Sequence, residues 1–129
     1  MIGYATLGTN NLARARAFYD ALLAEIGAKR LMELPEGFTL YGARVDRPAL
    51  AITPPYDGKE ARPGNGNMLA LVLEERAKVD ALYQKALQLG GSCEGAPGVR
   101  GEEGPQAFYA AYFRDPDGNK LCAFRVGPA

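Results

Sequence analysis

The sequence predicts an α+β fold built from two β-α-β-β-β modules within a single domain, residues 1–129. Three observations predict it. Two strand-helix patterns occur along the chain at a constant offset, each is followed by β-rich sequence, and a Pro- and Gly-rich stretch separates them. A chain with 47% hydrophobic residues is long enough for one compact core but short for two independent domains.

The first module spans residues 1–54. A strand-like stretch at 2–7 is followed by Asn10 and Asn11, which are residue types that favour helix N-caps. A helix is predicted next, because apolar residues recur at spacings of 3, 4, 3 and 4, namely Leu12, Ala15, Tyr19, Leu22 and Ile26. Gly27 ends this helix. Three further strands are predicted at 30–34, 38–45 and 49–53, with turn-forming residues between them.

The second module spans residues 66–127 and repeats this pattern. The segment 54–66 has no apolar period and is rich in Pro and Gly, which is typical of a connection. A strand at 67–73 precedes a second helical face at Val79, Leu82, Ala86 and Leu89. Adding 64 to the residue number carries Tyr19 to Tyr83 and Gly27 to Gly91. This shared offset indicates an internal repeat.

The end of the second module predicts an antiparallel hairpin. Strands at 107–113 and 120–126 flank Asp115-Pro116-Asp117-Gly118, a sequence with the residue preferences of a type I turn. The preceding segment, 93–106, contains four glycines and predicts one irregular strand followed by a mobile loop.

Composition excludes several classes of function. Lys plus Arg and Asp plus Glu both total 15, so no net charge would attract nucleic acid or an anionic membrane. No signal peptide or membrane-spanning segment is apparent, which predicts a cytoplasmic protein. Cys93 and Cys122 are expected to be free thiols. Histidine is absent, which removes the commonest general base and the commonest ligand of transition metals.

Two motifs carry a resemblance to a known family. An Asn-capped helix contains Arg-Ala-Arg-Ala-Phe-Tyr at 14–19, and the C-terminal turn reads Phe-Arg-Asp-Pro-Asp-Gly-Asn at 113–119. Together with the repeated β-α-β-β-β pattern, these motifs resemble the glyoxalase/bleomycin resistance/dioxygenase superfamily, whose members are also called vicinal oxygen chelate proteins. The resemblance implies two modules that form a curved mixed sheet around a cleft, in which the family's enzymes hold a divalent metal that chelates two oxygens of the substrate.

The positions that match the family's metal ligands carry other residue types. Tyr4 occupies the position of the histidine in the first strand, and Met68 the comparable position in the second module. Cys122 replaces the glutamate of the last strand, and the strand at 49–53 contains no carboxylate. A phenol, a thioether and a thiol do not suit Mg, Mn, Fe, Ni or Zn coordination. We therefore predict neither a metal nor another cofactor, although Glu33, Glu102 and Glu103 are carboxylates outside these positions that could bind one.

Tyrosines dominate the residues expected to line the cleft. The candidate ligand-binding residues are Tyr4, Tyr41, Met68, Arg100, Tyr109, Tyr112 and Cys122. A tyrosine-lined cleft suits a flat or apolar molecule with a few polar groups, and the fork of the Arg100 guanidinium suits a carboxylate. The same tyrosines would also suit a dimer interface. We assign no catalytic residue, because no histidine is available to activate Cys122.

Two classes of function follow from these observations. The first is a homodimeric protein that binds a small organic molecule without a metal. The second is a divergent lyase, isomerase or dioxygenase that uses an atypical metal site, or a metal-free enzyme in which a tyrosine such as Tyr4 acts as the acid. Neither class predicts nucleic acid or a membrane as a partner.

Overall fold

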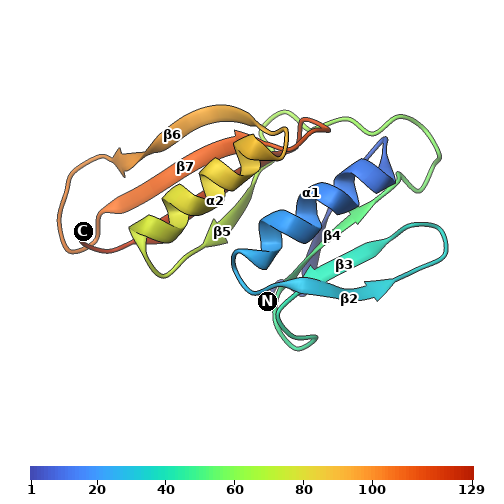
Figure 1. The fold of residues 1–129 in the computed structure, drawn as a ribbon, viewed down its shortest axis with the longest axis horizontal. Coiled ribbons are helices and arrows are strands. Elements are labelled where there is room, and N and C mark those ends of the chain that lie inside the picture. The colour runs from blue at the N-terminus through green and yellow to red at the C-terminus, as the bar shows by residue number, and fades with distance from the viewer. The chain divides into compact units, whose positions relative to one another are not determined.

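A computed structural model describes all residues, 1–129, as two compact units, each with one helix and one four-stranded sheet (Figure 1). The first unit comprises Met1–Gly64 and Pro116–Asn119, and the second comprises Asn65–Asp115 and Lys120–Ala129. The element order is β-α-β-β-β in each half of the chain. The predicted α+β class and the two modules are therefore confirmed.

The sheet of the first unit has the strand order β1-β4-β3-β2. Its elements are β1 (Tyr4–Gly8), α1 (Leu12–Ala24), β2 (Lys29–Glu33), β3 (Thr39–Gly42) and β4 (Ala49–Thr53). β1 and β4 are parallel, and the other neighbours are antiparallel. β3 is shorter than the predicted strand at 38–45, because the chain turns after Gly42 and the turn is closed by a hydrogen bond from Arg47 N to Arg44 O.

Helix α1 begins where the sequence predicts. The Asn11 side chain accepts a hydrogen bond from Arg14 N at 3.0 Å, which satisfies a backbone donor that has no partner within the helix. The buried face of the helix consists of Ala15, Phe18, Tyr19, Leu22 and Leu23. The α-helix ends at Ala24 rather than Ile26, because the next N–H groups bond to carbonyls three residues back and tighten the last turn.

The second unit repeats this topology with the strand order β5-β8-β7-β6. Its elements are β5 (Leu69–Val72), α2 (Arg76–Gln88), β6 (Ser92–Arg100), β7 (Phe108–Arg114) and β8 (Lys120–Val126). β7 and β8 form the predicted antiparallel hairpin, and β5 lies parallel to β8. Neither helix has the length and apolar content needed to cross a lipid bilayer.

β6 is the irregular strand that the sequence predicts, and a loop follows it after Arg100. It is a nine-residue strand that stays paired with β7 despite Gly95, Pro97 and Gly98. Pairing survives because the register shifts between Cys93 and Gly95 and again between Gly95 and Gly98, so the intervening residues bulge out of the ladder.

The glycines that close the two helices have different structural roles. Gly27 has a left-handed φ of 76°, and in the second unit this conformation belongs to Gly90, with φ 99°. Gly91, the repeat partner of Gly27, instead allows a close approach, since a Cβ there would lie 2.7 Å from the carbonyl oxygen of Arg114. The constant offset therefore aligns residue types but not backbone conformations at this position.

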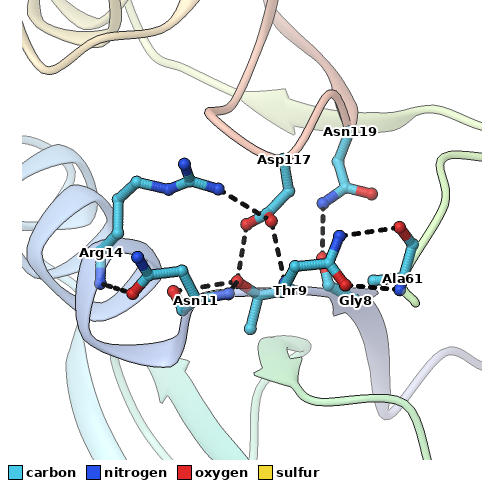
Figure 2. Close-up of polar contacts among 8 residues, drawn as sticks. Gly8, Thr9, Asn11, Arg14, Ala61, Asp117 and Asn119 are labelled. Atoms are coloured by element: carbon cyan, nitrogen blue, oxygen red, sulfur yellow. Dashed lines mark hydrogen bonds and ion pairs between the residues drawn. The ribbon is translucent and has the colours of Figure 1, made fainter. Parts of the chain in front are cut away.

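The turn between β7 and β8 belongs to the first unit, and the Asp117 carboxylate explains why. It accepts hydrogen bonds from Thr9 Oγ1 at 2.6 Å and from Asn10 N at 2.9 Å (Figure 2). The Arg14 guanidinium lies 3.1 Å from the same carboxylate, whose side chain is only 3% exposed. A nearly buried carboxylate is stable when it has several donors and a cation, and all of these donors come from the corner between β1 and α1.

Two asparagines extend this network. The Asn119 side-chain amide donates to Gly8 O at 2.9 Å. The Asn10 side chain donates to Ala61 O at 3.0 Å and accepts from Ala61 N at 2.6 Å, which fixes the connection after β4 (Figure 2). The two motifs that carry the family resemblance, at 14–19 and 113–119, thus contribute to a single structural network.

We expect the substitution Asp117→Asn to lower the free energy of unfolding by about 2 kcal/mol, because it removes the charge that Thr9, Asn10 and Arg14 all approach. Urea denaturation measures this change. Asp46→Asn is the matched control, since Asp46 forms an exposed ion pair with Arg44 and its loss should change stability by less than about 0.5 kcal/mol. Equal effects of the two substitutions would contradict the structural role of Asp117.

Candidate functional site

The sheet of the second unit has one face covered by α2 and one helix-free face. Tyr109 points to the covered face, where its hydroxyl donates to Asp80 of α2 at 2.6 Å. Because side chains alternate along a strand, Tyr112 projects to the opposite face. Its cross-strand partner Cys122 lies there too, as do Ala110 and its partner Phe124. We call this surface, defined by Arg100, Phe108, Tyr112, Lys120, Cys122 and Phe124, the helix-free face.

Two cations lie beside the Tyr112 ring on the helix-free face. The Arg100 guanidinium carbon is 5.4 Å from the ring centroid, and Lys120 Nζ is 5.5 Å from it. Both distances are within the roughly 6 Å range of an attractive cation-π interaction. The three side chains come from three adjacent strands, β6, β7 and β8, so the sheet itself brings them together.

Arg100 is held in place by its own strand. Its Nη1 donates to Gly98 O at 2.9 Å and its Nη2 to Ala96 O at 2.7 Å. A Cβ at Gly95 would lie 3.2 Å from Nη2, and one at Gly98 would lie 3.2 Å from Nη1. The two glycines thus leave room for the guanidinium beside β6. Both carbonyls that accept its hydrogen bonds belong to the stretch of β6 in which the register shifts.

The charges of the helix-free face do not balance. Arg114 is paired with Glu94 at 2.5 Å. Neither Arg100 nor Lys120 has a carboxylate within the 4.0 Å limit of an ion pair. The surface around Tyr112 therefore carries two positive charges without a paired anion.

The thiol and the phenol of the helix-free face are uncharged at neutral pH. Burial raises the pKa of the Cys122 thiol. Burial and the neighbouring Cys122 raise the pKa of the Tyr112 hydroxyl. A thiol with a raised pKa is a poor nucleophile and a poor metal ligand at pH 7, since both roles need the thiolate. The Tyr112 side chain can still offer a hydrogen bond and a flat surface to a ligand, whereas Cys122 is buried beneath it.

Two of the predicted lining residues, Tyr41 and Tyr109, lie on the helix-covered faces of their sheets. Tyr41 is 1% exposed and packs under α1, where its hydroxyl donates to Asp20 at 2.8 Å. Burial and this bond raise the pKa of Tyr41. Tyr109 packs against α2 through Asp80. Strand alternation gives two faces but does not reveal which one a helix covers, and here both tyrosine hydroxyls donate to carboxylates of the helices.

Two further candidates, Tyr4 and Met68, have exposed side chains. Tyr4 is 57% exposed and packs edge to face against Phe38 of its own unit, with ring centroids 5.8 Å apart. Met68 is 44% exposed and immediately precedes β5. Tyr4 belongs to the first unit and Met68 to the second.

The unmatched carboxylates do not form a metal site either. Glu33 is paired with Arg30 at 2.9 Å, and Glu103 with Arg76. Glu102 lies exposed in the loop after β6. No group of three or more His, Cys, Asp or Glu side chains is arranged to hold an ion. The side chains at these positions therefore do not fit the divalent metal that enzymes of the resembled family hold.

Sequence reasoning did not select Lys120, Gly95 or Gly98 as site residues. A signal for Lys120 was present, because it lies two residues before Cys122 and so shares its strand face. No local signal distinguished Gly95 and Gly98 from turn-forming glycines, since their role depends on the position of Arg100 across the bulge.

The first unit has a surface hollow of about 750 Å³ that the sequence did not indicate. It is bordered by the ends of β1 and β4, at Gly8 and Thr53, and by the connection at 55–62. Charged residues of both signs line it, among them Asp57, Lys59, Glu60 and Arg62. Opposite charges in one open hollow do not select a ligand class, so the helix-free face is the stronger candidate site.

Comparison with known proteins assigns the fold to a family. The model of the glyoxalase/bleomycin resistance protein/dioxygenase superfamily matches residues 1–123, nearly the whole chain. The chain belongs to this superfamily. A comparison with curated protein sequences found no match.

Solved structures of the superfamily align along the whole chain. A glyoxalase/bleomycin resistance protein from Albidiferax ferrireducens T118 is 35% identical, with 97% of this chain and 98% of that chain covered and a TM-score of 0.85. A superfamily enzyme from Burkholderia phytofirmans PsJN is 19% identical, with 96% and 97% covered and a TM-score of 0.72. A lactoylglutathione lyase from Agrobacterium tumefaciens is 19% identical, with 97% and 92% covered and a TM-score of 0.64. The latter two likenesses concern the fold alone.

We expect iodoacetamide at pH 7 to modify Cys93 in the native protein and to leave Cys122 unmodified. Cys93 is exposed, whereas Cys122 is 1% exposed and its pKa is raised by burial. Mass spectrometry of the labelled peptides measures both sites, with urea-unfolded protein as the control in which both react. Rapid modification of Cys122 in native Cys93→Ser protein would contradict this environment.

Proposed function

We propose that this superfamily member binds a small organic molecule on the helix-free face of its second sheet and does so without a divalent metal. The observation that carries the proposal is the cation pair, in which Arg100 and Lys120 lie beside the uncharged Tyr112 ring. An aromatic floor with a few fixed polar groups is the usual composition of a small-molecule site.

The chemistry of the donors supports binding without a metal. The positions that match the family's ligands hold a phenol at Tyr4, a thioether at Met68 and a thiol at Cys122. Burial raises the pKa of Cys122, so deprotonation of the thiol by a metal would be opposed rather than assisted. Hard divalent cations prefer oxygen and imidazole ligands, which these three side chains do not offer.

A lyase, isomerase or dioxygenase activity has less support. The lactoylglutathione lyase from Agrobacterium tumefaciens shares the fold at 19% identity, and its activity does not transfer at that distance. The helix-free face supplies no histidine and no unpaired carboxylate to act as a base near Tyr112. Binding requires only the groups that are present on this face.

Pairing of two chains into a homodimer is part of the same proposal. Twofold dimers are the commonest assembly of small proteins. Light scattering of the purified protein would report a mass near twice the 13.8 kDa of one chain. A monomeric mass at micromolar concentration would contradict the dimer and leave the proposed binding face unaffected.

We expect Mn²⁺, Ni²⁺ and Mg²⁺ to leave the melting temperature of the protein unchanged. A ligand that binds only the native state raises the apparent stability, so a site for these ions would reveal itself as a rise. Differential scanning calorimetry with and without a chelator measures the effect. The Cys93→Ser variant is the control, because it removes the exposed thiol as an adventitious ligand. A saturable rise in the variant would overturn metal-free binding.

The binding proposal has its own experiment. Native mass spectrometry of freshly purified, unheated protein should detect a bound small organic molecule, and Tyr112→Ala should lose it because the ring forms the floor of the site. Tyr56→Ala is the matched control, since Tyr56 is a fully exposed tyrosine of the connection after β4. A bound molecule retained by Tyr112→Ala and lost by Tyr56→Ala would place the site elsewhere.

A further inference from the structure

We infer that the ligand of the helix-free face is an organic carboxylate, held through its two oxygens by Arg100 and Lys120, with a flat apolar body lying on the neighbouring aromatic side chains. This inference rests on the proposed function and specifies the class of molecule that the site selects. Its basis is the charge, the free hydrogen-bond donors and the shape of the face.

The charge arrangement favours an anion. Arg100 and Lys120 lie beside one ring, and neither is paired with a carboxylate. Two like charges at a partly buried surface repel each other, and an anion bound between them removes that cost. Glu94, the nearby carboxylate, is held by Arg114 at 2.5 Å; its charge is felt by Lys120, but it forms no ion pair with either cation.

The donors of the cation pair remain largely free. A guanidinium has five N–H groups, and Arg100 uses two of its groups in hydrogen bonds to Gly98 O and Ala96 O. The Lys120 ammonium makes no hydrogen bond or ion pair within the protein. A carboxylate accepts two parallel bonds from a guanidinium fork, and such charge-assisted bonds are stronger than neutral ones. The free donors of this pair thus match a two-oxygen anion better than a single carbonyl or hydroxyl.

The fixed position of the Arg100 guanidinium lowers the entropy cost of binding a carboxylate. Binding usually costs the entropy of ordering a long side chain. Here the guanidinium is already fixed by two carbonyls of β6 and by the Tyr112 ring, in the space that Gly95 and Gly98 leave open. A ligand would therefore meet a cation that is already in position.

The neighbouring side chains define the rest of the ligand. Phe108 and Phe124 lie beside each other on the helix-free face, with ring centroids 5.4 Å apart and an interplanar angle of 31°. Phe124 is paired in register with Val72 of β5, which is 72% exposed. An exposed apolar strip next to an aromatic pair suits a flat hydrocarbon body. The ligand class is therefore a carboxylate attached to an aromatic or similarly planar group.

The test uses three probes that share a naphthalene ring and differ in charge: 2-naphthoate, 2-naphthamide and 2-naphthylmethylammonium. Chemical shift changes in the ¹⁵N-labelled full chain measure the affinity and the location of each probe. We expect 2-naphthoate to bind at least about tenfold more tightly than the amide, with shifts in β6, β7 and β8, and the ammonium probe to bind most weakly.

Four variants test which residues bind the carboxylate of 2-naphthoate. Arg100→Gln and Lys120→Gln should each weaken 2-naphthoate binding about tenfold, while Arg100→Lys should restore only part of it, because the charge remains but the fork is lost. Gly98→Ala should weaken binding without unfolding the protein, since a Cβ 3.2 Å from Nη1 displaces the guanidinium. Arg125→Gln is the matched control and should bind as the wild type does, because strand alternation places Arg125 on the face that α2 covers.

The outcomes separate this inference from the proposed function. Binding of the amide or the ammonium probe to the same strands as tightly as 2-naphthoate would refute the carboxylate and leave small-molecule binding standing. Equal weakening by Arg125→Gln and Arg100→Gln would refute the specific role of Arg100. If none of the three probes shifts the resonances of β6, β7 or β8 at millimolar concentration, both the inference and the proposed binding face are wrong.

Discussion

The nearly buried carboxylate of Asp117 is the constraint on which much of the structure depends. It joins the turn after β7 to Thr9, Asn10 and Arg14, and Asn119 adds a bond to Gly8. Lys120 begins β8 immediately after this turn. The β7-β8 register that brings Cys122 opposite Tyr112 begins with the pair Arg114 and Lys120, one on either side of this turn.

The fold was largely predictable because its signals are local. The cap at Asn11, the bounds of β4 and β8 and the hairpin between β7 and β8 all follow from residue type and spacing. The site was less predictable because its geometry is not local. The sequence did not show that Tyr41 and Tyr109 face the helices, since the face that a helix covers is decided by packing. The position of the Arg100 side chain depends on register shifts in β6, and these cannot be predicted from the spacing of Gly95 and Gly98.

The two modules show how one topology yields different surfaces. In the first, Arg30 of β2 turns toward the helix, where it donates to both oxygens of Asp20 at 2.8 and 2.7 Å. Burial alone would raise the pKa of Asp20, but the bonds from Arg30 and Tyr41 lower it. In the second, Arg100 of β6 turns away from the helix and lies over Tyr112 without a carboxylate. The arginine of one edge strand is neutralised within the fold, and that of the other remains available to a ligand.

The assignment of Pro116–Asn119 to the first unit has a consequence for the order in which the protein forms on the ribosome. Thr9 and Asp117 are separated by 108 positions along the chain. During synthesis the residues of β1 and α1 emerge first, yet Thr9 and Arg14 lack their carboxylate partner until Asp117 has been made. Such a distant contact closes late and slows folding. The first unit is thus completed only after Asp117 has been translated, so the segment Met1–Gly64 lacks one of its stabilising contacts while it is nascent.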